Sequence, residues 1–203
     1  MNILIQKAKV VDPGGKYHNK IRDILITDGK IVKIAAKINT PKHTVYSAKN
    51  LHVSLGWFDL HANFRDPGFE YKEDINSGSK AAAKGGFTGV LLMPQNNPVT
   101  DNNAQVEYIR NKARNNIVEV YAAGSITKAM QGKEMVEMYD MKDAGAVAFT
   151  DDKKALQHNE VMKNALLYTK DFDGLIMNFA NDTSIFNEGQ IHEGEISTAL
   201  GLK

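Results

Sequence analysis

From about residue 55 the sequence alternates between short apolar runs and longer stretches with helical periodicity. The predicted strands are residues 56–64, 89–93, 117–124, 144–150 and 175–180. The predicted helices between them are residues 75–84, 103–115, 132–143 and 159–168. Strands joined by helical crossovers form a parallel sheet, and a series of this kind is typical of a TIM-like (β/α) barrel. The predicted fold class is therefore α/β.

Residues 1–54 follow a different pattern, in which turn formers separate short β-like runs. These runs are residues 2–11, 21–27, 30–34 and 44–47. Asp12-Pro13-Gly14-Gly15 closes the first run, and Asp28-Gly29 is a strong hairpin signal. The pattern predicts a small, sandwich-like N-terminal β domain at 1–54, followed by the first five β/α units of a barrel at 55–203.

The length of the chain conflicts with a closed barrel. Such a barrel has eight strands and about 250 residues, whereas this chain has 203 residues. An open parallel sheet would expose apolar edges, which soluble proteins avoid. We therefore expect the chain to be the N-terminal half of a larger protein. The alternative is a naturally short domain that pairs with a second chain.

Composition excludes several classes of function. The hydrophobic fraction of 42% and the charged fraction of 24% are ordinary for a globular protein. A net charge of +1 gives no electrostatic reason to expect nucleic acid or an anionic membrane as partner. The absence of cysteine excludes disulfides and thiolate zinc sites. No apolar run reaches the roughly 18 residues of a membrane span, and the N-terminus lacks a signal-peptide core, so we expect a cytoplasmic protein.

The first barrel-type strand leads into the sequence DLHANFRDPG at residues 59–68. On a strand, residues two apart point to the same face, so His61, Asn63 and Arg65 are predicted to project together. Two imidazoles at this spacing, followed by a guanidinium, would form a metal clamp beside an anion anchor. Here the second imidazole is replaced by the amide of Asn63, a much poorer zinc ligand.

The motif resembles the dihydroorotase branch of the amidohydrolase superfamily, whose members carry Asp-x-His-x-His-x-Arg-x-Pro-Gly at the end of the first barrel strand. Further segments resemble the same family in the same order: SGSKAAAKGGFT at 77–88, MPQNNP at 93–98, AFTDD at 148–152 and EGEISTALGL at 193–202. The resemblance covers the whole chain. It implies a barrel enzyme of pyrimidine biosynthesis that hydrolyses a cyclic amide with zinc.

The resemblance also implies which residues would hold the metal. The family binds one or two zinc ions with the paired histidines, an Asp after strand four and a His after strand five, and the metal generates hydroxide. His61 matches the first histidine and Asp152 matches the Asp, with Asp151 as a supporting or surface residue. Asn63 and Phe179 stand at the other two positions. Two of these four ligands are therefore replaced.

The resemblance implies an altered substrate site as well. Arg65 matches the arginine that pairs with the carboxylate of dihydroorotate. Its usual partner is an Asn, and Gln95 occupies that position. The extra methylene of Gln displaces the amide beyond hydrogen-bonding tolerance unless the backbone moves. Asn96 would take over the role after a small shift.

Without the resemblance these residues have simpler interpretations. His61 alone would be a packed histidine, and Asp151 with Asp152 would be a loop or helix cap. Met135, Met138 and Met141 recur at near-helical spacing, which predicts a core-facing stripe rather than a binding surface.

Three functions remain in competition. The first is a non-catalytic dihydroorotase homologue that serves as a scaffold, with aspartate transcarbamoylase or further copies of itself as partners. The second is an active dihydroorotase with a reduced zinc site. The third is another cyclic-amide hydrolase, such as a hydantoinase, but that class uses a carbamylated Lys and residues 144–150 contain none. The loss of two zinc ligands is hard to repair locally, and this favours the scaffold.

Overall fold

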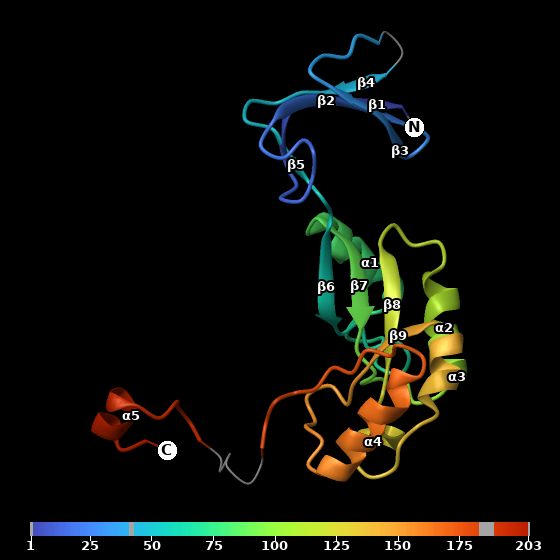
Figure 1. The fold of residues 1–203 in the computed structure, drawn as a ribbon, viewed down its shortest axis with the longest axis vertical. Coiled ribbons are helices and arrows are strands. Elements are labelled where there is room, and N and C mark those ends of the chain that lie inside the picture. Colours follow the sequence, from blue (N-terminus) through green and yellow to red (C-terminus); the bar gives the residue numbers. More distant parts are fainter. Residues whose placement is uncertain (1, 41–42, 183–188, 203) are drawn as a thin grey trace. The chain divides into compact units, whose positions relative to one another are not determined.

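The computed structural model describes residues 2–40, 43–182 and 189–202. The chain divides into two compact units, Met1–Gly56 and Trp57–Lys203. The first unit contains a mixed sheet and the second a parallel sheet with helices (Figure 1), which confirms the α/β class. No helix among the described residues has the length and apolarity needed to cross a membrane.

The first unit is a five-stranded sheet with the order β3-β2-β1-β4, in which β5 also pairs with β1. Its strands are β1 (Ile3–Val11), β2 (Ile21–Thr27), β3 (Lys30–Ala35), β4 (Thr44–Tyr46) and β5 (His52–Ser54). The predicted hairpin is confirmed, because β2 and β3 pair antiparallel around Asp28 and Gly29, whose φ angles are 50° and 76°. The predicted runs match the first four strands. The short strand β5 was not predicted as a separate element.

The second unit contains a four-stranded parallel sheet with the order β6-β7-β8-β9. Its strands are β6 (Trp57–Ala62), β7 (Phe87–Leu92), β8 (Glu119–Gly124) and β9 (Ala146–Phe149). The helices are α1 (Ile75–Lys84), α2 (Asn103–Ala113), the 3₁₀ turn η1 (Lys128–Met130), α3 (Met138–Asp143), α4 (Asn159–Lys170) and α5 (Glu195–Leu200). Strand and helix alternate as predicted as far as α4.

Two predicted elements are wrong in extent. Residues 175–180 do not form a strand, since only Ile176 pairs with Phe149 as an isolated bridge. The physical reason is that β9 ends at Phe149, and the next carbonyl on that edge, Asp151 O, accepts instead from Lys154 N–H in its own turn at 3.0 Å. Residues 177–180 therefore have no further β9 residues with which to pair.

The predicted helix 132–143 forms only over Met138–Asp143. Residues 126–136 instead fold back on themselves, with Lys128 N–H donating to Glu134 O at 2.8 Å and Val136 N–H donating to Ile126 O at 3.1 Å. These long-range bonds use backbone groups that a helix would need.

Alternate residues of the parallel sheet pack on two different faces, as strand geometry requires. The helix-covered face (Figure 1) includes Val90, Leu92, Ala122 and Phe149, packed with Ile109, Met138 and Met141. The opposite face carries a second buried cluster of Leu91, Met93, Ala123 and Ala148. Met138 and Met141 are fully buried and Met135 packs against the same cluster, so the predicted core-facing position is confirmed, although Met135 precedes helix α3.

A buried carboxylate, Asp66, fixes the loop that follows β6. Asp66 is 0% exposed, and its oxygens accept hydrogen bonds from Ile75 N–H at 3.0 Å and the Tyr108 hydroxyl at 3.0 Å. The Lys112 amine lies 2.8 Å from the same carboxylate. Burial opposes the charge on Lys112, but its hydrogen bonds to Asp66 and Tyr108 outweigh this effect and raise its pKa. The loop is thereby tied to the start of α1 and to α2.

Replacing Asp66 should destabilise the second unit. Asp66→Ala leaves a buried N–H and a partly buried ammonium without their acceptor, so we expect a loss of about 2–4 kcal/mol in the free energy of unfolding. Urea unfolding followed by circular dichroism measures this loss. The control Asp143→Ala, at an exposed position, should change stability by less than about 0.5 kcal/mol. Equal effects of the two variants would contradict the role given to Asp66.

Candidate metal and substrate site

The two predicted metal-ligand residues, His61 and Asp152, are in direct contact. His61 Nε2 lies 2.6 Å from Asp152 Oδ1. His61 is in β6 and Asp152 follows β9, and these are the outer strands of the four-stranded sheet. In a flat sheet they would be separated by three strand spacings, about 14 Å, which these two side chains do not span. The sheet must therefore curl, which brings the carboxyl ends of its outer strands together.

The contact pairs a buried carboxylate with a partly exposed imidazole. The Asp152 side chain is 2% exposed and the His61 side chain 44%. Asp152 has a positive φ of 54°, and its N–H donates to Thr150 Oγ1 at 3.0 Å. A non-glycine residue in this conformation must be held by its surroundings. Here those surroundings direct the carboxylate to His61.

Asn63 contributes a buried oxygen that has no protein partner. Its Oδ1 atom is inaccessible to solvent and accepts no hydrogen bond, and the same is true of Asp152 Oδ2 and of the Ser125 hydroxyl oxygen. Among the described residues, these three are the buried side-chain atoms that lack a hydrogen-bond partner. All three follow a strand at the carboxyl edge of the parallel sheet. Sequence reasoning missed Ser125, since a single serine after a strand carries no distinctive signal.

The predicted substrate-side residues lie in loops at the same edge of the sheet. Arg65 has a positive φ of 60°, so the strand alternation that placed it with His61 and Asn63 does not extend to it. Gln95 is partly buried. Asn96 is 7% exposed and its amide N–H donates to Thr100 Oγ1 at 3.1 Å. The Asn96 amide is therefore already engaged within its own loop.

Phe179 lies in the irregular segment that follows the isolated bridge, and its side chain is 47% exposed. The phenyl ring offers no donor atom to a metal. The structure thus brings His61 and Asp152 together and leaves Phe179 on a half-exposed segment outside the sheet.

Asp151 supports the loops at the carboxyl edge of the parallel sheet. It is 2% exposed and accepts hydrogen bonds from Ile126 N–H at 2.8 Å and Thr127 N–H at 3.0 Å, as well as from the Thr127 hydroxyl. Of the two expected positions, supporting or surface, the structure therefore shows the supporting one. Asp151 joins the loop after β8 to the loop after β9, and so holds Ser125 and Asp152 at neighbouring positions along the edge.

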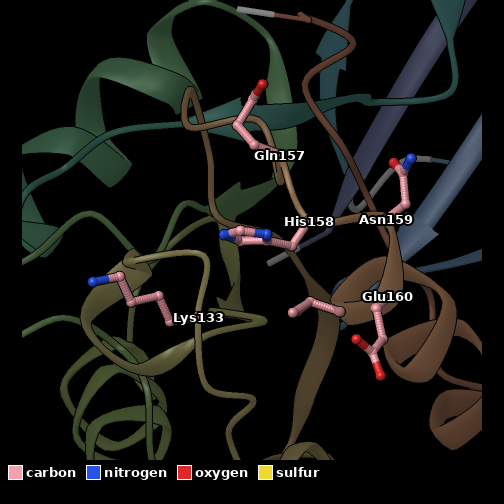
Figure 2. Close-up of a pocket in the computed structure, with 6 residues that line it drawn as sticks. Lys133, Gln157, His158, Asn159 and Glu160 are labelled. Atoms are coloured by element: carbon pink, nitrogen blue, oxygen red, sulfur yellow. The ribbon is translucent and has the colours of Figure 1, made fainter.

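An open cleft of about 480 Å³ lies between the 126–136 loop and the start of α4. Its polar lining is Lys133, Gln157, His158, Asn159 and Glu160. Figure 2 shows the His158 imidazole extending toward the loop that carries Lys133. None of the predicted site residues lines this cleft.

The model of the dihydro-orotase-like family matches residues 52–203, which is most of this chain. The chain belongs to the dihydroorotase-like family. Its curated relatives include dihydroorotases of Syntrophotalea carbinolica, 43% identical over 204 residues, and Caldicellulosiruptor saccharolyticus, 44% identical over 206 residues. These alignments cover 100% and 99% of this chain but 48% and 47% of the relatives. The chain therefore spans about half the length of these dihydroorotases.

Solved amidohydrolase structures resemble the fold. An L-hydantoinase (dihydropyrimidinase) from Arthrobacter aurescens matches with a TM-score of 0.75 at 21% identity, over 90% of this chain and 41% of that one. A dihydroorotase crystal structure matches with a TM-score of 0.62 at 15% identity, over 89% and 51%. At these identities the likeness concerns the fold alone.

The zinc that the dihydroorotase-like family implies does not fit the residues of this chain. Zinc favours several imidazole, thiolate or carboxylate donors. Here one imidazole and one carboxylate meet, and the neighbouring Asn63 offers only a neutral oxygen. The described ranges contain no group of three or more His, Cys, Asp or Glu that could hold a metal ion.

Restoring both replaced histidines should restore zinc affinity. In the full-length protein, Asn63→His combined with Phe179→His adds two imidazoles to the existing His61 and Asp152. We expect the double variant to bind zinc well above the parent. Either single change should do much less, because the gains are coupled. Zinc titration of the four proteins measures this. An unchanged double variant would mean that the frame no longer accepts a zinc site.

Proposed function

We propose that this chain is the N-terminal part of a dihydroorotase-like protein of pyrimidine biosynthesis that no longer hydrolyses the ring amide and serves as a scaffold. One observation carries the proposal: Asn63 and Phe179 replace two imidazoles in the matched motifs, while the remaining His61 and Asp152 bond directly to each other. The parallel sheet would be the first part of a (β/α)₈ barrel, which the curl between β6 and β9 supports.

The chemistry of ring opening supports the loss of activity. Attack on a cyclic amide at neutral pH requires an activated water, and a bound metal supplies one by lowering the pKa of that water. Neither an amide oxygen nor a phenyl ring performs this task. His61 is hydrogen-bonded to a carboxylate, and this pair brings no metal ion to polarise the amide carbonyl.

In this proposal the residue that would bind the substrate carboxylate is kept, unlike the metal ligands. Arg65 is retained, and the loop beside it is held by the buried Asp66 network. A carboxylate ligand such as dihydroorotate would then bind weakly without reacting. The proposed partners are aspartate transcarbamoylase or further copies of the chain, in the cytoplasm, since a scaffold acts through assembly rather than turnover.

The second candidate is an active dihydroorotase with a reduced metal site. The His61–Asp152 contact favours it, because two former ligands still converge. Ligands from the part of the relatives that this chain does not span would have to complete the site.

A ring-opening assay separates the two candidates. With added zinc, we expect the full-length protein to hydrolyse dihydroorotate slower by several orders of magnitude than the Syntrophotalea carbinolica dihydroorotase tested in parallel. The reason is that loss of the metal-bound nucleophile raises the barrier by many kcal/mol. Turnover within the usual enzyme range of about 1–1000 per second would refute the scaffold and establish the second candidate.

A further inference from the structure

The two units of the chain carry opposite charge, which the net charge of +1 for the whole chain conceals. With histidines neutral, residues 1–56 contain nine lysines and one arginine against three aspartates and no glutamate, a net charge of +7. Residues 57–203 contain 15 basic and 21 acidic residues, a net charge of −6. An asymmetry of this kind is typical of a protein in which one part binds an anionic partner. The first unit is therefore a basic module.

The aspartates of the first unit leave most of its positive charge uncompensated. Asp23 is 3% exposed, and its oxygens accept hydrogen bonds from Lys7 N–H at 2.9 Å and Ile38 N–H at 2.8 Å. The Asp12 carboxylate lies against Gly15, where an added Cβ would meet Asp12 Oδ2 at 1.8 Å. Among the described residues of this unit, no lysine or arginine side chain forms an ion pair. These cations are therefore available to a partner.

Three of the cations gather where β1 turns back into β2, and they form the basic cluster of Lys16, Lys20 and Arg22. The Lys16 ammonium lies 5.6 Å and the Arg22 guanidinium carbon 5.8 Å from the centre of the Tyr17 ring. The Lys20 ammonium donates to Lys16 O at 3.2 Å. Like charges gathered around one ring repel one another, and an anionic ligand relieves that repulsion.

An exposed row of side chains adjoins the basic cluster. Ile21 lies opposite Lys9 in the β1–β2 ladder, and Lys9 lies beside His52 in the β1–β5 ladder. All three are exposed, Ile21 at 61%. An apolar side chain among cations matches the anatomy of protein–protein interfaces, in which an apolar core is surrounded by a polar rim. Nucleic-acid interfaces are more polar, and the Tyr17 ring is already engaged by two cations rather than open to stack on a base.

We propose that the basic cluster, together with the exposed Ile21, docks an acidic segment of a partner protein. Carboxylates of that segment pair with Lys16, Lys20 and Arg22, and an apolar residue of the segment contacts Ile21. This inference deepens the proposed scaffold function and rests on it for the purpose of the docking, because a scaffold needs a surface that its partner recognises. The basic cluster belongs to the five-stranded sheet, whereas the candidate metal and substrate site belongs to the four-stranded one, so the two are tested separately.

The probe is a fluorescein-labelled peptide of glutamate, isoleucine and glycine, and its reference is the same peptide with glutamine in place of glutamate. We expect the full-length protein to bind the acidic peptide in a fluorescence anisotropy titration, and to bind the reference peptide far more weakly. Binding should weaken between about 0.1 M and about 1 M salt, because the screening length falls from about 10 Å to about 3 Å. The charge reversal Lys16→Glu/Lys20→Glu/Arg22→Glu should weaken binding about tenfold or more, because like charges then face each other.

The matched control is Lys80→Glu/Lys84→Glu/Lys163→Glu, which changes the net charge equally at exposed positions of the second unit and should leave the Kd nearly unchanged. Far-UV circular dichroism and urea unfolding show whether each variant is folded. The milder variant Lys16→Gln/Lys20→Gln removes charge without reversing it, and it should weaken binding less than the charge reversal does.

The proposal is overturned if the acidic peptide does not bind, or if the folded cluster variants and the control weaken binding equally, since overall charge would then be the cause. Tighter binding of single-stranded DNA of equal charge, or of phosphatidylserine vesicles, would also overturn it and would make the partner a nucleic acid or a membrane. Hydrolysis of dihydroorotate together with cluster-dependent peptide binding would refute the scaffold function and leave the docking surface standing.

Discussion

The hydrogen bond between His61 and Asp152 is the contact on which the site depends. It joins residues from the two outer strands of a four-stranded parallel sheet, and it forms only because the sheet curls. The curl arises from the normal twist of parallel strands whose one face is covered by helices. Asp151 assists by holding the loop after β8 against the loop after β9. This edge of the sheet therefore holds close together two residues that match the family's metal-binding motifs.

The residues at this edge differ from the metal-binding motifs of the family at two positions. In the motifs that match the family, Asn63 and Phe179 stand where histidines are expected, and the proposal rests on this amide oxygen and hydrocarbon ring in place of nitrogen donors. Asn63 Oδ1 and Asp152 Oδ2 are buried without a hydrogen-bond partner. A folded protein tolerates such atoms when something else satisfies them. The proposed scaffold function follows from this set of residues.

Local signals were sufficient for much of the fold. Helix α1 has the bounds expected from the sequence, because Asp74 caps its start and Gly85-Gly86 end it. The pairing of His61 with Asp152 followed from matched motifs 91 residues apart. The missing fifth strand and the short α3 were not predictable, since both depend on which distant backbone groups are already paired. Ser125 was missed for the same reason: its importance arises from burial, which a single serine does not signal.

The central claim is that this member of the dihydroorotase-like family has lost the family's zinc centre. Elemental analysis of the full-length protein, purified without added metal or chelator, tests the claim most directly. The account predicts substoichiometric zinc, because His61 and Asp152 bring only two zinc donors together and the described residues contain no group of three or more. One or more tightly held zinc ions per chain would contradict it, and would show that ligands outside this half rebuild the centre.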